Sequence, residues 1–142
     1  CASILSKFTL PDYGLYSATK AALSHVCRSM RCELADDGIA VSSVHPVTTR
    51  TEFFDVARKS SGEGHGPVVE DGVPTHAPKM FVQSPEVVAK AVVRCLRRPR
   101  AEVWTSRIGR FSAGLFEMFP PVYEQVLRAE MRRKRREAAS AD

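Results

Sequence analysis

The chain has 142 residues, 44% of them hydrophobic and 26% charged, and its formal net charge is +5. This composition is that of an ordinary globular domain and excludes a largely disordered chain. No run of about 18 apolar residues occurs and no secretory signal is visible, so we expect neither a transmembrane helix nor a leader. The chain starts with Cys1 instead of Met, and its first residues resemble the end of a buried strand, so we expect a fragment of a longer protein.

Four cysteines are spread along the chain without a CxxC pair, namely Cys1, Cys27, Cys32 and Cys95. Their spacing gives little support to a zinc or redox site, so we expect no metal, and we expect the thiols to be buried and reduced. Reduced thiols are typical of the cytoplasm, which is the compartment we expect.

The first third of the chain alternates between extended and helical patterns. Residues 1–4 are apolar, as at the end of a strand, and residues 5–12 form a loop. From residue 13 to about residue 35 apolar side chains recur at spacings of three and four, which predicts a helix. Gly38 suits the left-handed conformation that often ends a helix. Residues 39–44 are small or β-branched and predict a short buried strand.

The rest of the chain begins with a long loop-like stretch, residues 47–83, with a short helical turn near residues 52–59. Ser84, Pro85 and Glu86 are typical of a helix start, because they supply an N-cap, a first-turn proline and an acid near the positive end of the dipole. Residues 101–105 predict a strand. Residues 107–139 predict helix, interrupted at Pro120 and Pro121. Strands that alternate with helices indicate an α/β fold with a parallel sheet.

Tyr16 and Lys20 stand four residues apart at the start of the first predicted helix, so both side chains lie on one face, one turn apart. A phenol ordinarily has a pKa of about 10 and is a poor acid–base catalyst at neutral pH. A nearby cation favours the ionised form, and such a pair could pass a proton to or from a carbonyl or alcohol oxygen. Alone, the spacing is common by chance, and a partly buried tyrosine beside a solvated lysine is the alternative.

The neighbouring residues carry a resemblance. The segment from Tyr16 to Leu23 is YSATKAAL, which resembles the YxxxK motif of the short-chain dehydrogenase/reductase family, often written YSASKAAL. Ser3 lies thirteen residues before Tyr16, at the position of the family's active-site serine. Pro11 matches a proline in the loop between them.

The resemblance extends to Pro46 and the threonines after it, which align with the family's Pro-Gly segment, and more loosely to residue 105. It implies the C-terminal half of a Rossmann-type doubly wound parallel sheet, with the N-terminal dinucleotide-binding half missing. The whole of 1–142 would then belong to a single domain. Its parts would be a catalytic segment (1–51), a substrate lid (52–83), a helix and strand (84–106) and a helical tail (107–142).

The resemblance also implies roles for particular residues. Tyr16 would exchange the proton, Lys20 would bind the nicotinamide ribose of NAD or NADP, and Ser3 would hydrogen-bond the substrate oxygen. Tyr16 and Lys20 would also contact the cofactor, together with Pro46, Val47 and Thr51. Two hydroxyls are weaker alternatives: Ser6 for Ser3, and Thr49 for Thr51.

Two departures from the family pattern stand out. Val47 replaces the family's glycine, which permits close approach and positive φ, so the loop could follow another path. No strand–GxxxGxG–helix unit occurs in the chain, and the glycine run Gly62-x-Gly64-x-Gly66 predicts only loop. We therefore expect an NAD(P)-dependent oxidoreductase for a carbonyl or alcohol substrate, inactive as the fragment alone. The alternative is a non-catalytic truncated protein or pseudoenzyme that acts by binding.

Further expectations concern partners. The family resemblance implies a homodimer or homotetramer, in part through the Tyr16 helix. The basic residues 128–136 follow an apolar stretch and could meet an acidic membrane surface, so a protein peripheral to a membrane is conceivable. The alternative is a packed helix with a solvated basic end, and we expect no nucleic-acid partner. His45 lies near the expected active site, where it could contact substrate.

Overall fold

The computed structural model describes residues 1–60, 69–75 and 77–139. The helices are α1 (Gly14–Glu33), α2 (Phe53–Ser60), α3 (Pro85–Arg97), α4 (Arg107–Met118) and α5 (Pro120–Ala139), with 3-10 turns η1 (Ile4–Ser6) and η2 (Lys79–Phe81). The strands are β1 (Ser43–His45), β2 (Thr48–Thr49), β3 (Val69–Glu70), β4 (Val73–Pro74), β5 (Val82–Gln83) and β6 (Glu102–Trp104). This order confirms an α/β chain.

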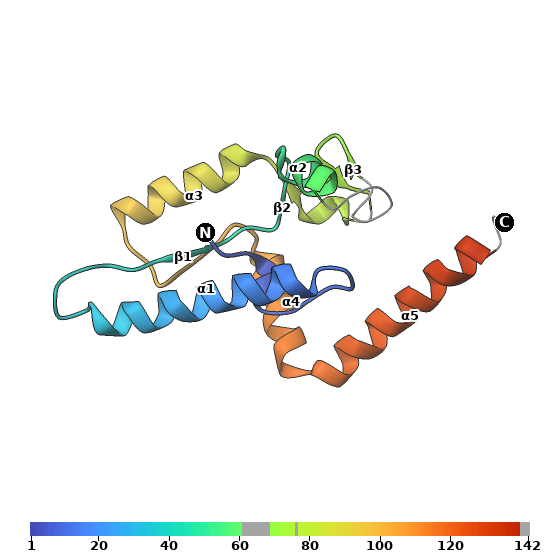
Figure 1. The fold of residues 1–142 in the computed structure, drawn as a ribbon. Coiled ribbons are helices and arrows are strands. Elements are labelled where there is room, and N and C mark those ends of the chain that lie inside the picture. Colours follow the sequence, from blue (N-terminus) through green and yellow to red (C-terminus); the bar gives the residue numbers. More distant parts are fainter. Residues whose placement is uncertain (61–68, 76, 140–142) are drawn as a thin grey trace.

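A layer of parallel segments forms the centre of the fold. Strands β1 and β6 are parallel, with Val44 opposite Val103 and His45 opposite Trp104. On the other edge of β1, the Ala2 N–H donates to the Val44 carbonyl at 2.8 Å and the Ile4 N–H donates to the Pro46 carbonyl at 2.9 Å. Figure 1 shows α3 and α1 on opposite sides of the β1–β6 pair. The expected parallel arrangement is therefore present.

The strand expected at residues 39–44 begins later, because β1 covers only Ser43–His45. The reason is visible at Val41, whose carbonyl accepts a hydrogen bond from Arg31 Nε at 2.9 Å. A side chain of α1 thus occupies a backbone group that a longer strand would pair. Gly38, before this segment, has a φ of 71°, which confirms its left-handed conformation.

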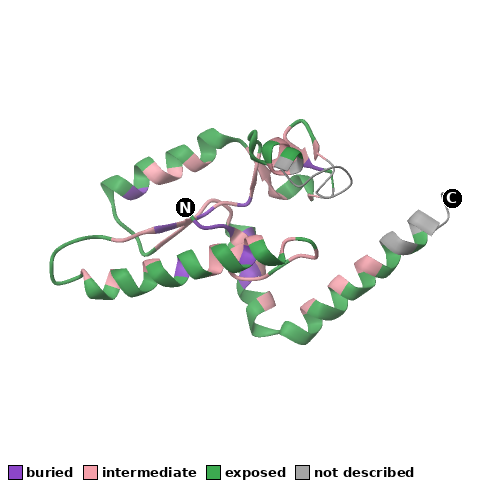
Figure 2. Ribbon diagram, viewed as in Figure 1, coloured by how far each residue is buried: buried purple, intermediate pink, exposed green. Residues whose placement is uncertain are grey.

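Helix α1 has the predicted spacing, but its apolar stripe faces outward. Ser17 and Ser24 are the buried residues of α1, whereas Leu15, Val26 and Met30 are exposed. Figure 2 shows exposed positions along most of the helix. Small hydroxyl residues therefore face the rest of the chain, and the larger apolar side chains of Leu15, Val26 and Met30 are 40% or more exposed.

The stretch predicted as loop contains more pairing than expected. The helical turn near 52–59 is confirmed as α2, but β2 pairs in parallel with β5, and β3 and β4 form an antiparallel hairpin. At the hairpin turn Asp71 has a φ of 50° and Gly72 a φ of 69°, which is the conformation that an Asp-Gly pair favours between two strands. The run Gly62–Gly66 lies outside the described residues.

The C-terminal region is helical as predicted, with α4 ending at Met118 and α5 beginning at Pro120. Figure 1 shows α5 extending away from the rest of the chain. Its first turn is held by aromatic contacts: the Tyr123 ring lies 4.6 Å from Phe116 and 5.6 Å from Phe8. The Tyr123 hydroxyl donates to the Thr9 carbonyl, and burial raises the pKa of Tyr123 to about 12.

The cysteines differ from expectation. All four are free, but Cys95 alone among them is buried, while Cys1 and Cys32 are exposed. The expectation of buried thiols was therefore wrong for these two. Cys32 lies in the last turn of α1, on a side of the helix that faces solvent, and Cys1 is the first residue of the chain.

Candidate active site

The Tyr16–Lys20 pair lies in the first half of α1, and the structure brings the two side chains together. Lys20 Nζ is 5.6 Å from the centre of the Tyr16 ring, as expected for residues one turn apart. The Tyr16 ring also lies 5.8 Å from Phe53 at the start of α2. Tyr16 therefore has both a cation and an apolar ring as neighbours.

Ser3 sits at the end of the segment that pairs with β1, and it is buried. Its backbone is extended, and its Oγ accepts a hydrogen bond from the Leu5 N–H at 3.2 Å. A hydroxyl that accepts one bond keeps its proton for another partner. Lys20 Nζ donates to the Cys1 carbonyl at 3.3 Å, so Lys20 ties α1 to the segment that carries Ser3.

Ser6, the alternative to Ser3, faces a different direction. Its Oγ is 3.1 Å from Nδ1 of His45, on β1. The Ser6 hydroxyl is therefore turned to the buried imidazole of His45, whereas Ser3 Oγ is bonded to the Leu5 N–H of its own turn.

Val47 does not need the conformation that glycine would provide. Among the described residues, the non-glycine residues with positive φ are Asp12 and Asp71, so Val47 has an ordinary backbone. Its side chain is buried, its N–H donates to Thr105 Oγ1 at 3.4 Å, and its carbonyl accepts from Thr49 Oγ1 at 3.0 Å. The space for it comes from Gly109, where a Cβ would meet Val47 Cγ1 at 2.9 Å.

The two candidate threonines differ in the hydrogen bonds that their hydroxyls already make. Thr49 Oγ1 donates to the Val47 carbonyl and accepts from Gln83 Nε2 at 3.1 Å, so both of its functions are used. Thr51 is exposed, and its Oγ1 accepts from the Phe53 N–H at 3.4 Å, which leaves its proton free to donate. The geometry favours Thr51 over Thr49 as a hydroxyl that meets a ligand.

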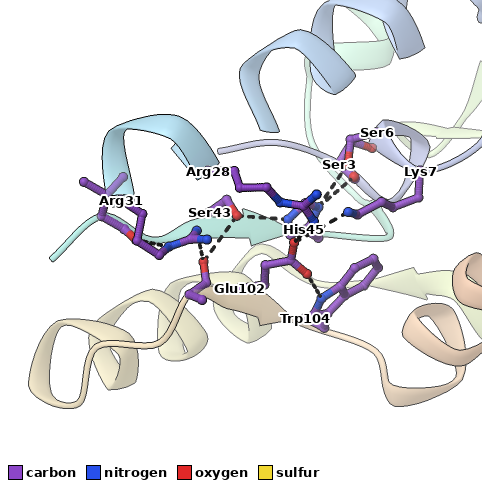
Figure 3. A network of polar contacts seen from close by, with 11 residues as sticks. Ser3, Ser6, Lys7, Arg28, Arg31, Ser43, His45, Glu102 and Trp104 are labelled. Carbon is purple, nitrogen blue, oxygen red and sulfur yellow. Dashed lines mark hydrogen bonds and ion pairs between the residues drawn. The ribbon is translucent and has the colours of Figure 1, made fainter. Parts of the chain in front are cut away.

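His45 lies in the interior of the fold and not at a surface open to substrate. It is 0% exposed, so the expected contact with substrate is excluded by its burial. Figure 3 shows it enclosed by Ser3, Ser6, Ser43 and Trp104. Burial is the largest influence on the ring and lowers the pKa of His45, so the imidazole stays neutral at neutral pH.

Glu102 connects this cluster to the surface. Its carboxylate accepts from Trp104 Nε1 at 3.1 Å and lies 3.5 Å from Lys7 Nζ and 3.7 Å from Arg28. Partial burial opposes ionisation, but the Trp104 hydrogen bond and the Lys7 charge together hold the pKa of Glu102 below its usual value. The carboxylate therefore remains charged and anchors Trp104 beside His45.

A large groove among the described residues lies away from the candidate site residues. It has a volume of about 1340 Å³ and lies between α3, β6 and α4, with six arginines in its lining. None of the predicted site residues lines it. Among the described residues no group of three His, Cys, Asp or Glu could hold a metal ion, and no helix has the length and hydrophobicity to cross a bilayer.

Comparison with known proteins agrees with this geometry. The family profile described as short chain dehydrogenase matches residues 1–62. A Drosophila melanogaster protein named dehydrogenase/reductase SDR family protein 7-like is 31% identical over 122 residues, which are 85% of this chain and 35% of that protein. An Anopheles gambiae protein of the same name is 27% identical over 127 residues, 89% of this chain and 38% of that protein.

An uncharacterized oxidoreductase of Mycobacterium bovis is 28% identical over 116 residues, 82% of this chain and 29% of that protein. The chain thus spans about a third of the length of the curated relatives it matches. No solved structure matches the chain significantly. The parallel layer, the Tyr16–Lys20 pair and these relatives together show that the chain belongs to the short-chain dehydrogenase family.

Gly109→Ala tests the packing that accommodates Val47. The added methyl group would lie 2.9 Å from Val47 Cγ1 and 3.0 Å from Ile4 Cδ1. We expect the free energy of unfolding to fall by about 1–3 kcal/mol, because both neighbours must shift. Chemical denaturation measures the change.

Gly114→Ala, on the same helix, is the matched control, because a Cβ there meets nothing within 4 Å. We expect it to raise the free energy of unfolding by about 0.5–1 kcal/mol through helix propensity alone. Val47→Ala should restore part of the loss in Gly109→Ala. Equal effects of the two glycine substitutions would show that Val47 does not pack on Gly109.

Proposed function

We propose that this chain carries the catalytic residues of an NAD(P)-dependent oxidoreductase that interconverts a carbonyl and an alcohol. The observation that carries the proposal is the Tyr16–Lys20 pair, tied through the Lys20 hydrogen bond to the segment that ends in Ser3. A bound nicotinamide would supply or accept the hydride. The protein's own part is to hold the substrate oxygen and to exchange its proton.

Tyr16 is the proton-exchanging residue in this proposal. Its hydroxyl gives a proton to the carbonyl oxygen during reduction and takes one from the alcohol during oxidation. The ammonium of Lys20, 5.6 Å from the centre of the Tyr16 ring, places a positive charge beside the exchanging group. The Ser3 hydroxyl donates to the same substrate oxygen and stabilises its developing negative charge.

The residues after β1 are suited to a nicotinamide nucleotide. Thr51 has an exposed hydroxyl with a proton to donate, which fits a carboxamide or a phosphate oxygen. Both backbone polar groups of Val47 already have partners in the chain, so Pro46 and Val47 would contact the ring through apolar atoms. Lys20, with two further donors on its ammonium, would reach ribose hydroxyls.

The adenosine half of the cofactor needs residues beyond these 142. A pyrophosphate is ordinarily held by a glycine-rich turn at a helix N-terminus, and the sequence contains no strand–GxxxGxG–helix unit. We therefore assign the dinucleotide-binding part of the activity to the additional length that the relatives have, and we expect residues 1–142 alone to be inactive.

Tyr16→Phe is the direct test of the catalytic assignment. In the intact protein it should lower kcat roughly 100- to 10,000-fold, which is the usual contribution of general acid–base transfer. Turnover of NADH or NADPH is measured with a panel of ketones and aldehydes, and the melting temperature is measured alongside.

Tyr13→Phe is the control, since the Tyr13 ring lies 6.5 Å from Tyr16 at the same end of α1. It should leave kcat within a few-fold of the parent. Retained turnover in Tyr16→Phe would refute the role of Tyr16, and with it the proposed function.

Homo-oligomerisation through α1 belongs to the same proposal. The outward stripe of Leu15, Val26 and Met30 is an exposed apolar helix face, and a second copy of α1 would cover it. We expect Val26→Asp to shift the intact protein to a smaller assembly in analytical ultracentrifugation, because a charge would be buried in the interface.

Val93→Asp on α3 is the matched control: Val93 is 48% exposed and Val26 52%, but Val93 lies on a different helix. It should leave the sedimentation coefficient unchanged. An unaltered assembly in Val26→Asp would exclude α1 as the interface.

A second candidate function is contact with an acidic membrane surface, favoured by the exposed apolar residues of α4 and α5. Phe111 is 75% and Met118 69% exposed, and Val122 and Val126 continue the apolar surface towards the basic residues 128–136. Apolar side chains beside a cluster of basic residues are typical of helices that lie in a lipid interface.

Vesicle sedimentation distinguishes this contact from a solvated tail. We expect binding to vesicles that contain phosphatidylserine, weakened by salt because charges are screened, and about ten-fold weaker after Arg132→Glu with Arg133→Glu. Purely zwitterionic vesicles are the control. Binding that ignored the anionic lipid content would contradict the electrostatic contact.

A further inference from the structure

Among the described residues, His45 is the largest side chain that is fully buried. It lies at the carboxyl end of β1, between the segment that carries Ser3 and Trp104 on β6. Burying an imidazole is costly unless its nitrogens are hydrogen-bonded, so the partners of this ring indicate what it does.

The partners of the ring favour a proton on Nδ1. Nδ1 lies 3.2 Å from the carbonyl oxygen of Ser3, and a carbonyl oxygen only accepts, so this contact is a hydrogen bond when the ring proton is on Nδ1. Nε2 is then an acceptor, and it lies 3.1 Å from the hydroxyl of Ser43, closer than the Ala101 carbonyl at 3.4 Å that the same hydroxyl proton can reach, so this tautomer has Ser43 donating to Nε2. The Ser6 hydroxyl oxygen, 3.1 Å from Nδ1, is then the second acceptor of a bifurcated hydrogen bond from the Nδ1 proton.

This hydrogen bond acts on the backbone of Ser3. The Ser3 carbonyl accepts from His45 Nδ1 and from the Ser6 N–H at 3.1 Å, while its side chain accepts from the Leu5 N–H at 3.2 Å. Because both the carbonyl and Oγ of Ser3 accept hydrogen bonds, the backbone and the side chain of Ser3 are held in one orientation. Loss of the His45 bond would release the carbonyl on the β1 side.

The ring of His45 is itself held in place. It stacks on Trp104 at 4.6 Å with an angle of 11° between the planes. Trp104 is anchored by Glu102, which pairs with Lys7 and Arg28, and Figure 3 shows these residues beside the imidazole. Because the lowered pKa keeps His45 neutral, Nε2 remains able to accept from Ser43.

We infer that His45 is a positioning residue, which orients Ser3 towards the substrate oxygen by donating from Nδ1 to the Ser3 carbonyl. The inference rests on the proposed function for its effect on turnover, and on the hydrogen bonds of His45 for its geometry. His45 itself touches neither substrate nor cofactor.

A double-substitution cycle with Ser3 is the test. His45→Gln places its amide near the Nε2 position and loses the donor to Ser3, so in the intact protein kcat should fall roughly 10- to 100-fold. His45→Asn keeps a donor near the Nδ1 position and should retain most of kcat. The KM for NAD(P)H should stay within about two-fold in both, because the cofactor contacts of Tyr16 and Lys20 are unchanged.

In a Ser3→Ala background, His45→Gln should cause no further loss of kcat, because its effect acts through the missing hydroxyl. A purely structural role would lower activity by the same factor in both backgrounds. A folded His45→Gln variant with the parent kcat, or with the full loss added to that of Ser3→Ala, would overturn the inference.

Nitrogen NMR of the unsubstituted protein gives a readout that needs no activity. A proton on Nδ1 of His45 supports the inference, and a proton on Nε2 alone overturns it, because Nδ1 could then not donate to Ser3.

If His45→Gln fails to fold, Ser43→Ala replaces it, since it leaves the stacked ring and removes the donor to Nε2. In Ser43→Ala the inference predicts that the ring proton of His45 is shared between Nδ1 and Nε2. It also predicts that Ser43→Ala lowers kcat in the parent protein but not in the Ser3→Ala background. Retained turnover in Tyr16→Phe with the Nδ1 proton present would refute the proposed function and leave the His45 geometry intact.

Discussion

Strand β1 is hydrogen-bonded along both of its edges, and this pairing sets the positions of the candidate catalytic residues. On one edge the Ala2 and Ile4 N–H groups pair with the backbone of β1 and the residue after it, and Ser3 lies between them. On the other edge β6 brings Trp104 opposite His45. Because the segments are parallel, their carboxyl ends meet at one side of the layer, where ligands of open α/β sheets bind. The Lys20 hydrogen bond to Cys1 then attaches α1 to the same layer.

The loop after β1 shows how one substitution depends on a distant neighbour. A valine in place of the family's glycine is a departure when the segment is read alone. In the structure its side chain fills the space left by Gly109 on α4, and its backbone polar groups bond to Thr105 and Thr49. The loop therefore lacks the conformational freedom of a glycine and instead packs, through Val47, against helix α4. The same packing separates the two threonines, because Thr49 is drawn into the loop and Thr51 is left outside it.

The charges and apolar surfaces are arranged in separate regions. The outward stripe of α1 has few charges, which suits a second copy of the same helix. The exposed residues of α4 and α5 border strongly basic segments, so like charges would repel a second copy there, whereas an acidic surface would be attracted. Two kinds of partner are thus compatible with one chain, each at its own surface.

The sequence by itself determined the local features, because these depend on neighbours a few residues apart. The helical spacing predicted α1 and α3, Ser84 with Pro85 indicated where α3 begins, and YxxxK placed Tyr16 and Lys20 on one face. The Asp71-Gly72 pair was a signal of the same local kind, and it could have predicted the β3–β4 hairpin. The roles of Ser3, Tyr16, Lys20, Pro46, Val47 and Thr51 stay predictions, supported by the resemblance and by the geometry around them.

Only the tertiary structure decided which face of α1 points inward, how Val47 is accommodated and what His45 contacts. Spacing reveals that a stripe exists but not what covers it, and in α1 the small residues Ser17 and Ser24 face the chain instead of the larger apolar ones. His45 is joined to Ser3 across 42 positions of sequence, and Val47 meets Gly109 from a different helix. Contacts of this range exist only after the parallel layer has formed, because the pairing of β1 is what brings these residues together.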